Sequence, residues 1–490
     1  MNKRYTGIGE ECGLIGIYTE NSHEASRMIY YGLYSLQHRG QESCGIAINN
    51  SEKVTCYKDL GLVGDVFDDK RLSMLQGNIA IGHVRYSTTG SNTRENAQPL
   101  VVKYAKGTLT IAHNGNIANA LELRTSLENE GAVFQTGSDT EVICYLIARE
   151  RVKTPSVEEA IKRVIPMLKG SFSLLVMSPK KLIAVRDPYG IRPLCMGQTD
   201  DTTVFSSESC ALDTLKARFI RDLRPGEIVV ADRAFNIIHS HEDFCSPNDK
   251  RSALCIFEHI YFARPDSVID KQSVYESRIT AGRLLAKAHP VDADIVIAVP
   301  DSGIIAAIGY SRESGIPYGE GLIKNRYIGR TFIQPNQSMR ETSILIKLNV
   351  LRHNIQDKRV VLVDDSIVRG TTIANLVRMI KNAGAKEVHV RISSPKFLWP
   401  CYFGTDVPDR DSLVCNIYTE DELCKKIGAD SLGFLQLEHL PEIVKDSKLS
   451  CCDACFSGSY PFELPEHPQK SVFESQFSNH SPTKSGDSDD

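Results

Sequence analysis

Hydrophobic and polar positions alternate over short stretches in the first half of the chain, which predicts strands and helices separated by Gly-rich turns. The expected strands are residues 13–18, 79–85, 109–113, 172–177 and 226–230. Helices are expected after three serines that can act as N-caps: Ser22 to about residue 37, Ser138 to about residue 150, and Ser156 to about residue 168.

The pattern changes after about Cys245. Residues 246–251, Ser-Pro-Asn-Asp-Lys-Arg, are polar and rich in turn-forming residues, which predicts a linker. Beyond the linker, nearly continuous Val and Ile strands alternate with helices. The strands are expected at 295–299, 359–363 and 387–392, and the helices from Ser302 and from Thr371 to about residue 383. This alternation is typical of a buried parallel sheet.

Composition narrows the possible functions. Hydrophobic residues make up 41% and charged residues 24% of the 490 residues, which suits a globular protein of two or three domains. The net charge of −4 argues against a protein that mainly binds nucleic acid or an anionic membrane. No apolar run approaches the roughly 18 to 20 residues of a membrane span. Glu10 and Glu11 stand where a signal peptide is apolar, so a cytoplasmic protein is expected.

The last residues of the chain have a different composition. Residues 465–490 are rich in Ser, Pro, His and Asp, with almost no aliphatic side chains. Such a segment buries too little apolar surface to offset the entropy lost on ordering. It is therefore predicted to be a disordered tail.

Cys12 is the first candidate for chemistry. The fourteen cysteines are too sparse for a disulfide scaffold, and most are expected to be small buried apolar residues. If the eleven residues before Cys12 are removed, however, the residue gains a free α-amino group with a pKa of about 8 beside its own thiol. That amine can serve as general base to the thiol. A structural cysteine at the start of a strand is the alternative.

Three other features of the first half suit a site around such a nucleophile. Arg85 ends a predicted strand, where its planar guanidinium can hold a carboxylate or form a surface ion pair. Asn114 and Gly115 are expected on a tight turn, where two donors can stabilise an oxyanion or simply make an Asn-Gly turn. Asp139 begins a predicted helix, where it can hold an ammonium group or favour the helix dipole.

Several motifs together resemble the class II glutamine amidotransferase domain. They are Glu-Cys-Gly-Leu-Ile-Gly around Cys12, Leu-Gln-His-Arg-Gly-Gln-Glu-Ser at 36–43, Gly-His-Val-Arg-Tyr-Ser-Thr at 82–88, His-Asn-Gly-Asn at 113–116, Gly-Ser-Asp-Thr-Glu at 137–141 and Arg-Asp-Pro-Tyr-Gly-Ile-Arg-Pro-Leu at 186–194. The resemblance implies an N-terminal-nucleophile hydrolase fold, an αββα sandwich, over residues 12–245, with residues 1–11 as a propeptide.

The same resemblance implies a role for each candidate residue. Cys12 would attack the side-chain amide of glutamine and release ammonia. Arg85 and Thr88 would hold the α-carboxylate and Asp139 the α-amino group. Asn114 and Gly115 would stabilise the oxyanion.

The second candidate site follows a buried strand that ends in Asp364 and Asp365. The sequence continues Ser-Ile-Val-Arg-Gly-Thr-Thr, with Gly370 in a turn before a helix that begins near Thr371. Backbone N–H groups at such a helix start can hold a phosphate, and two adjacent carboxylates can face ribose hydroxyls and Mg²⁺. An Asp-capped strand–helix connection is the alternative. The spacing differs from a P-loop and from a Gly-x-Gly-x-x-Gly motif.

This loop resembles the phosphoribosyl diphosphate (PRPP) motif of the type I phosphoribosyltransferases, an α/β fold with a parallel sheet. The residues that the resemblance assigns to PRPP are Asp364, Asp365, Ser366, Val368, Arg369, Gly370, Thr371 and Thr372. Val-Pro-Asp-Ser-Gly-Ile at 299–304 is similar to the pyrophosphate loop of that family. The Mg²⁺ ligands implied are Ser302, Asp364 and Asp365. The basic segment 324–335 is similar to the loop that closes over PRPP, although composition alone also suits a mobile surface loop.

Four cysteines form the third candidate site. Cys452 and Cys455 make a C-x-x-C pair, and Cys255 and Cys401 lie far upstream. This pattern suits zinc, an iron–sulfur cluster, or free thiols, and its spacing does not choose among them. The surrounding segments resemble the iron–sulfur-containing bacterial type of the amidophosphoribosyltransferase family, which implies a structural [4Fe–4S] cluster on these four residues. Cys451 is expected to be a bystander.

The motifs occur in the order of that family over residues 12–464. A glutaminase domain at 12–245 would precede a transferase domain at 246–464 that includes the cluster-binding segment. The implied reaction is glutamine-dependent amidation of PRPP to 5-phosphoribosylamine, with release of pyrophosphate and glutamate, the first step of de novo purine biosynthesis. Homotetramers or homodimers and feedback inhibition by purine nucleotides are also implied. The alternatives are another class II glutamine amidotransferase and a non-catalytic PRPP or nucleotide sensor.

Overall fold

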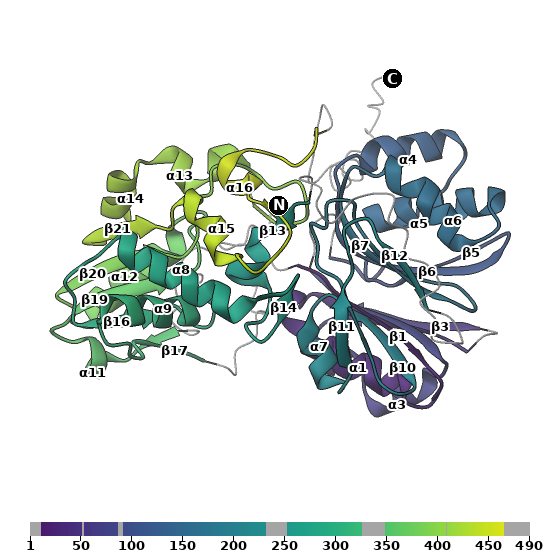
Figure 1. Ribbon diagram of the computed structural model, residues 1–490, viewed down its shortest axis with the longest axis horizontal. Helices are drawn as coiled ribbons and strands as arrows, with labels where there is room; N and C mark the ends of the chain where they lie inside the picture. Colours follow the sequence, from purple (N-terminus) through teal and green to yellow (C-terminus); the bar gives the residue numbers. More distant parts are fainter. Residues whose placement is uncertain are drawn as a thin grey trace, which may run out of the picture.

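The structure is a computed structural model that describes residues 11–50, 53–86, 92–231, 252–325, 348–407 and 409–464. The described chain forms two lobes, residues up to 231 in one and residues from 252 in the other (Figure 1). The predicted linker at 246–251, the predicted tail at 465–490, residues 1–10, Thr88 and most of the 324–335 loop lie outside the described residues.

The first lobe contains two antiparallel sheets packed face to face. In spatial order, the larger sheet contains β11 (Arg218–Asp222), β9 (Cys195–Gln198), β10 (Thr202–Ser206), β1 (Gly13–Thr19), β4 (Ile79–Arg85), β2 (Ser43–Asn49) and β3 (Val54–Leu60). The smaller sheet contains β12 (Ile228–Ala231), β8 (Leu182–Arg186), β7 (Gly170–Met177), β6 (Gly107–Ile117) and β5 (Leu100–Tyr104). Leu14 and Leu175 belong to one apolar cluster between the sheets.

Helices cover the outer face of each sheet, so the lobe has the four αββα layers that the family resemblance implied (Figure 1). On the larger sheet lie α1 (Ala25–Ser35), α2 (Val63–Val66), α3 (Asp69–Met74) and α7 (Ser209–Thr214). On the smaller sheet lie α4 (Ala120–Asn129), α5 (Asp139–Lys153) and α6 (Val157–Val164). Ser138 and Ser156 cap α5 and α6 as predicted, each accepting a hydrogen bond from a backbone N–H of the first turn.

The second lobe is built on the predicted parallel sheet. Its strands in order are β16 (Ile295–Ala298), β19 (Arg359–Asp364), β20 (Glu387–Ile392) and β21 (Ser431–Phe434), all parallel. The helices of this lobe are α8 (Val274–Ala288), α9 (Ile304–Ser314), α11 (Arg352–Ile355), α12 (Thr371–Asn382), α13 (Val414–Ile417), α14 (Glu420–Ile427), α15 (Leu440–Ile443) and α16 (Ala454–Ser457). Apolar clusters on both faces of the sheet explain its continuous Val and Ile strands.

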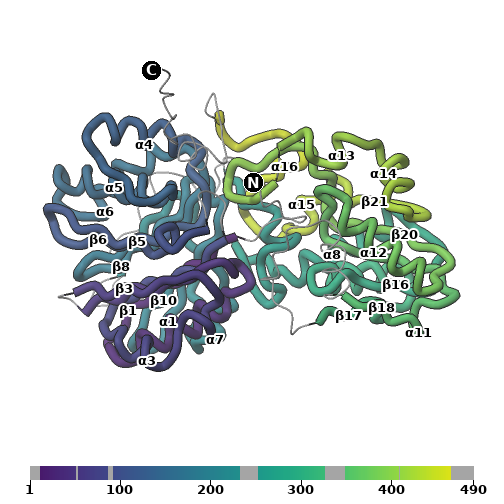
Figure 2. The backbone as a smooth tube through the Cα atoms, turned by 180° about the vertical axis from the view of Figure 1, so that it is seen from behind, coloured from purple at the N-terminus to yellow at the C-terminus, as the bar shows by residue number. Residues whose placement is uncertain are grey.

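Among its described residues, the second lobe also contains three short two-stranded pairs, of which the first joins the two ends of the lobe. They are β13 (Leu254–Cys255) with β22 (Cys451–Cys452), β14 (Val268–Ile269) with β15 (Gln272–Ser273), and β17 (Leu322–Lys324) with β18 (Leu348–Val350). A turn of π-helix, Glu258–Phe262, follows β13. Seen from behind, the yellow C-terminal segment with α15 and α16 lies near the middle of the molecule (Figure 2).

Two local predictions are wrong. Ser22 does not cap a helix, because Asn21 forms the turn there: its side chain accepts a hydrogen bond from the His23 N–H and its carbonyl accepts one from the Glu24 N–H, and α1 begins only at Ala25. Asn114 and Gly115 are not on a tight turn. They lie inside β6, which continues to Ile117 because it pairs with β7 along that whole stretch.

Candidate active sites

The first site is centred on Cys12, immediately before β1. Cys12 is buried, and its thiol donates a long hydrogen bond of 3.5 Å to the Tyr86 carbonyl oxygen. Burial raises the pKa of this thiol to about 11, although Arg85 opposes the shift. Arg85 ends β4, and the sequence predicted this position at the end of a strand. The structure shows in addition that Arg85 is buried and that β4 pairs with β1. The thiol in this chain, with Glu11 still attached, is therefore protonated at neutral pH.

Asn114 lies in the smaller sheet with its side chain completely buried. Neither its Oδ1 nor its Nδ2 has a hydrogen-bond partner among the described residues. An unpaired buried amide is costly, so it points to a group that binds there. The neighbouring Gly115 has a φ of +141°, and a Cβ atom on it would lie 2.1 Å from the Ser171 carbonyl oxygen. Only glycine fits at this position.

Asp139 is the first residue of α5 and is buried. Its Oδ2 accepts a hydrogen bond of 3.0 Å from the Ile117 N–H, and its Oδ1 lies 3.6 Å from Nδ1 of His113. Burial acts to raise the pKa of Asp139, but His113 and the backbone N–H groups outweigh it and lower the pKa. Asp139 is therefore an ionised carboxylate beside β6, suited to an ammonium group.

The second site is a cavity of about 180 Å³ at the carboxyl ends of β16 and β19. Its lining includes Asp364, Asp365, Ser366, Val368, Arg369, Gly370 and Thr372, with Ser302 opposite, and of the predicted set only Thr371 is not in the lining. Gly370 has a φ of +77° and precedes α12, so the loop turns directly into the helix start. The cavity thus combines a helix N-terminus with two carboxylates, an arrangement that suits a phosphorylated sugar.

The two carboxylates are buried side by side. Asp364 Oδ1 accepts a hydrogen bond of 2.9 Å from the Asp365 N–H, and Asp365 accepts hydrogen bonds from Ser302 and Ser366. Burial raises the pKa of both, and for Asp364 the charge of Asp365 raises it further. A bound cation would relieve this repulsion.

The oxygen donors of this cavity fit Mg²⁺. The described residues contain no group of three or more His, Cys, Asp or Glu side chains arranged around one metal ion. Magnesium, however, is commonly held by one or two carboxylates and by the phosphates of a substrate. Asp364 and Asp365 supply two carboxylates, and the Ser302 hydroxyl lies beside them.

Two residues near the cavity were not singled out from the sequence. Tyr261, on the π-helical turn, lines the cavity. Arg278, on α8, is buried and fixes this turn by donating hydrogen bonds to the carbonyl oxygens of His259, Tyr261 and Ala263. The motif Tyr-Phe-Ala-Arg-Pro-Asp at 261–266 could have drawn attention to Tyr261. Nothing in that motif indicates that Arg278 of α8 holds this turn in place.

The four predicted cluster cysteines come from three segments and lie in or against one apolar cluster, with Cys255 and Cys401 buried and Cys452 and Cys455 half-buried. Cys255 is directly opposite Cys452 in the β13–β22 pair. The Phe403 N–H donates to Cys401 Sγ at 3.4 Å, and the Leu398 N–H donates to the Cys455 carbonyl oxygen at 3.1 Å.

Burial and the neighbouring thiols raise the pKa of Cys452 and Cys455 well above the ordinary value and that of Cys255 to about 12. Thiolates at these positions would repel one another. A positively charged metal cluster bound among them would relieve that repulsion. Cys451 lies opposite Leu254 in the same pair, whereas Cys415 and Cys424 pack in a different apolar cluster.

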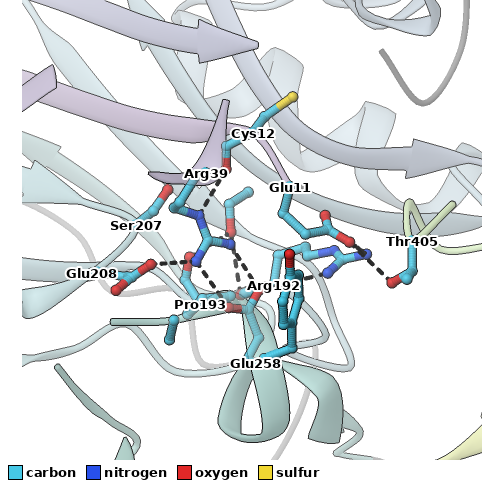
Figure 3. A network of polar contacts seen from close by, with 12 residues as sticks. Glu11, Cys12, Arg39, Arg192, Pro193, Ser207, Glu208, Glu258 and Thr405 are labelled. Atoms are coloured by element: carbon cyan, nitrogen blue, oxygen red, sulfur yellow. Dashed lines mark hydrogen bonds and ion pairs between the residues drawn. The ribbon is translucent and has the colours of Figure 1, made fainter. Parts of the chain in front are cut away.

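A buried ion-pair network lies between the two lobes, next to Cys12 (Figure 3). Its members come from distant parts of the sequence: Glu11, Arg39, Arg192, Glu208 and Glu258, all at most 1% exposed. Arg39 Nε donates to the Cys12 carbonyl oxygen at 3.0 Å, on the side away from the sulfur. Arg192 lies 2.9 Å from a Glu11 oxygen, and Thr405 donates to Glu11 at 3.0 Å.

Sequence reasoning missed this network. Arg39 and Arg192 stand in the quoted motifs at 36–43 and 186–194, but charged residues are usually exposed and nothing local predicts their burial. Their partners are far away in the chain. Burial raises the pKa of Glu11 to about 7, with Arg192 opposing the shift.

Comparison with known proteins covers nearly the whole chain. The glutamine amidotransferase domain family matches residues 83–214, and the phosphoribosyl transferase domain family matches residues 277–393. The amidophosphoribosyltransferase of Archaeoglobus fulgidus is 50% identical over 457 residues, which are 93% of this chain and 98% of the relative. That of Bacillus subtilis is 46% identical over 463 residues, 94% of this chain and 95% of the relative.

Solved structures agree with these relatives. A structure described as the allosteric regulatory enzyme of purine biosynthesis has a TM-score of 0.86 at 43% identity, covering 94% of this chain and 98% of its own. The glutamine PRPP amidotransferase from B. subtilis, complexed with ADP and GMP, has a TM-score of 0.84 at 42% identity, covering 94% and 99%. Among the described residues, no helix has the length and apolar character needed to cross a bilayer.

Proposed function

The chain belongs to the amidophosphoribosyltransferase family, and from that premise we propose which of its residues carry each half of the reaction. The enzyme uses glutamine to convert PRPP to 5-phosphoribosylamine, releasing pyrophosphate and glutamate, at the start of de novo purine biosynthesis. The observation that carries the assignment is the content of the two lobes: one holds a buried cysteine and a buried amide that is unpaired among the described residues, and the other holds a buried diacid in a cavity of about 180 Å³.

In the glutaminase lobe, removal of residues 1–11 gives Cys12 its own α-amino group as general base. The thiolate attacks the side-chain amide carbon of glutamine, and ammonia leaves as the thioester forms. The Asn114 amide and the Gly115 N–H stabilise the oxyanion, a role supported by the lack of a hydrogen-bond partner for the Asn114 amide among the described residues. Arg85 and Thr88 hold the α-carboxylate of glutamine, and the ionised Asp139 holds its α-ammonium group. Water then hydrolyses the thioester to glutamate.

In the transferase lobe, Asp364 and Asp365 face the ribose hydroxyls of PRPP. The backbone of residues 366–372, at the start of α12, holds the 5-phosphate. The 299–304 loop, with Ser302, lies at the pyrophosphate. Asp364, Asp365 and Ser302 would hold Mg²⁺, which would supply charge neutralisation for the leaving pyrophosphate. Ammonia released at Cys12 crosses internally to C1 of the ribose, which keeps it from protonation in bulk solvent.

Cys255, Cys401, Cys452 and Cys455 are proposed to hold a structural [4Fe–4S] cluster. The placement of these residues, which come from three segments, in or against one apolar cluster supports this assignment. The cluster would tie the C-terminal segment to the start of the transferase lobe, where β22 pairs with β13.

Regulation and assembly are also proposed from the family. Purine nucleotides are expected to inhibit the enzyme, which the B. subtilis structure with ADP and GMP supports. A cytoplasmic homotetramer or homodimer is expected, with no nucleic-acid or membrane partner. Another class II amidotransferase is disfavoured by the diacid cavity, and a non-catalytic sensor by the presence of Cys12, Arg85 and Asp139.

A pair of variants tests the two-site assignment. Cys12→Ala should abolish glutamine-dependent synthesis of phosphoribosylamine but leave ammonia-dependent synthesis. Asp365→Asn should lower both by about two orders of magnitude, the size typical of losing an electrostatic group at a reacting centre. Loss of both activities in Cys12→Ala would contradict the assignment.

A further inference from the structure

Segment 402–405, which belongs to the transferase lobe, contacts the glutaminase site directly. The Asn116 side chain donates to the Tyr402 carbonyl oxygen at 2.8 Å. The Phe403 carbonyl oxygen accepts from the Ser171 hydroxyl at 2.6 Å and from Nε of Arg192 at 3.1 Å, with a further hydrogen bond from Arg192 Nη2. These donors come from β6, which contains Asn114 and Gly115, from its neighbour β7, and from the loop before β9.

Gly404 leaves no room for a side chain against the glutaminase lobe. Its φ is +109°, and it is buried against the other lobe. A Cβ atom there would lie 2.8 Å from Arg192 Nη2 and 3.3 Å from the carbonyl carbon of Gly115. A Cβ atom on Gly115 would in turn lie 2.1 Å from the Ser171 carbonyl oxygen. The backbone of Gly115 is therefore held between β7 of its own lobe and Gly404 of the transferase lobe.

We propose that residues 402–405 of the transferase lobe are a positioning element of the glutaminase site, in which the Phe403 carbonyl fixes Ser171 and Arg192 and the Gly404 backbone fixes Gly115. This inference rests on the proposed oxyanion role of Asn114 and Gly115. Oxyanion donors work only when they are aimed at the place where charge develops, so a small displacement lowers kcat. The contacts that carry the proposal lie at Gly115, Ser171 and Arg192, so the effect is expected on kcat more than on glutamine binding.

Gly404→Ala in the full chain is the test, with Gly315→Ala as the matched control. Gly315 also has a left-handed φ, +75°, but a Cβ atom there meets nothing within 4 Å. Gly404→Ala is expected to lower the glutamine-dependent kcat by about tenfold or more, with the glutamine KM and the ammonia-dependent rate within about twofold of the unsubstituted chain. Gly315→Ala should leave all three values unchanged.

A second variant covers the case in which Gly404→Ala does not fold. Ser171→Ala adds no atoms and removes one donor to the Phe403 carbonyl, so it should lower the glutamine-dependent kcat several-fold with the same pattern. An unchanged glutamine-dependent kcat in both variants would overturn the proposal, and so would an equal loss of glutamine- and ammonia-dependent rates. The intact mass of the Gly404→Ala chain shows whether residues 1–11 have been removed. If they are retained, the substitution impairs their removal and not the positioning of Gly115, and the proposal is wrong. If the unsubstituted chain itself releases no glutamate, the proposed function fails, and this inference fails with it.

Discussion

Arg39 and Glu258 form an ion pair with two hydrogen bonds, from Nη1 to Oε2 at 2.9 Å and from Nη2 to Oε1 at 2.8 Å, and neither side chain is exposed to solvent. Arg39 is in the glutaminase lobe and Glu258 in the transferase lobe. The same guanidinium donates through Nε to the Cys12 carbonyl oxygen. One buried side chain thus links the transferase lobe to the backbone of the nucleophile.

Glu258→Gln should therefore destabilise the protein strongly. The substitution removes a buried charge that faces Arg39 and, at 3.6 Å, Arg192, and it leaves both cations under-compensated. Breaking a buried pair in this way costs about 3 to 5 kcal/mol. Urea denaturation should show a clear drop in the midpoint. Asp294→Asn is the control, because Asp294 pairs with Arg359 near the surface and its loss should lower the midpoint much less. Equal midpoints for the two variants would contradict the role given to Glu258.

The stability of the unprocessed chain should depend on the ionisation of Glu11. Burial raises its pKa from about 4.5 to about 7, so between these values the folded chain keeps a proton that the unfolded chain has released. Folding is then favoured at low pH, and this contribution is lost as pH rises toward 7. A Cys12→Ala chain that retains residues 1–11 should lose about 2 to 3 kcal/mol more between pH 5 and pH 8 than the same chain with Glu11→Gln.

Urea denaturation at several pH values measures that difference. Subtracting the Glu11→Gln chain removes the contribution of other buried acids, such as Asp222, whose pKa burial also raises to about 7. Parallel pH dependences in the two chains would show that Glu11 is ionised, or exposed, in the folded protein.

Local chemistry explains which elements the sequence predicts well. Ser138 and Ser156 cap their helices through hydrogen bonds to residues two and three positions away. The strands at 359–364 and 387–392 are apolar because helices cover both faces of the sheet. The prediction at Ser22 is wrong because Asn21 forms the turn first. The prediction at Asn114 is wrong because pairing with β7 keeps the chain extended.

Long-range contacts explain what the sequence does not predict. Arg39 and Glu258 are 219 positions apart. The local sequence of each is compatible with an exposed charged residue, and only the contact between the lobes buries them together. The contact of Gly404 with Gly115 likewise depends on the docking of two lobes. Cys12 and Asp364 stand in family motifs and can be proposed from the sequence, whereas the buried residues that contact their surroundings cannot.

Cys452→Ser should give a colourless protein of low stability if Cys452 binds the cluster. The expected loss is the absorbance of the [4Fe–4S] centre together with a lower unfolding temperature, since metal binding and folding are coupled. Cys424→Ser is the control, because Cys424 packs in another apolar cluster and matches no ligand motif. A stable brown Cys452→Ser protein would indicate that Cys451, its neighbour in β22, is the ligand instead.

Glutamate release from glutamine by anaerobically purified protein, with and without Mg²⁺ and PRPP, most directly tests whether the two lobes act as one enzyme. Strong stimulation of glutamate release by PRPP is expected, because the transferase lobe contacts the Cys12 site through Glu258 and through residues 402–405. Glutaminase activity that does not respond to PRPP would contradict the coupling of the two sites and would require a different acceptor for the ammonia.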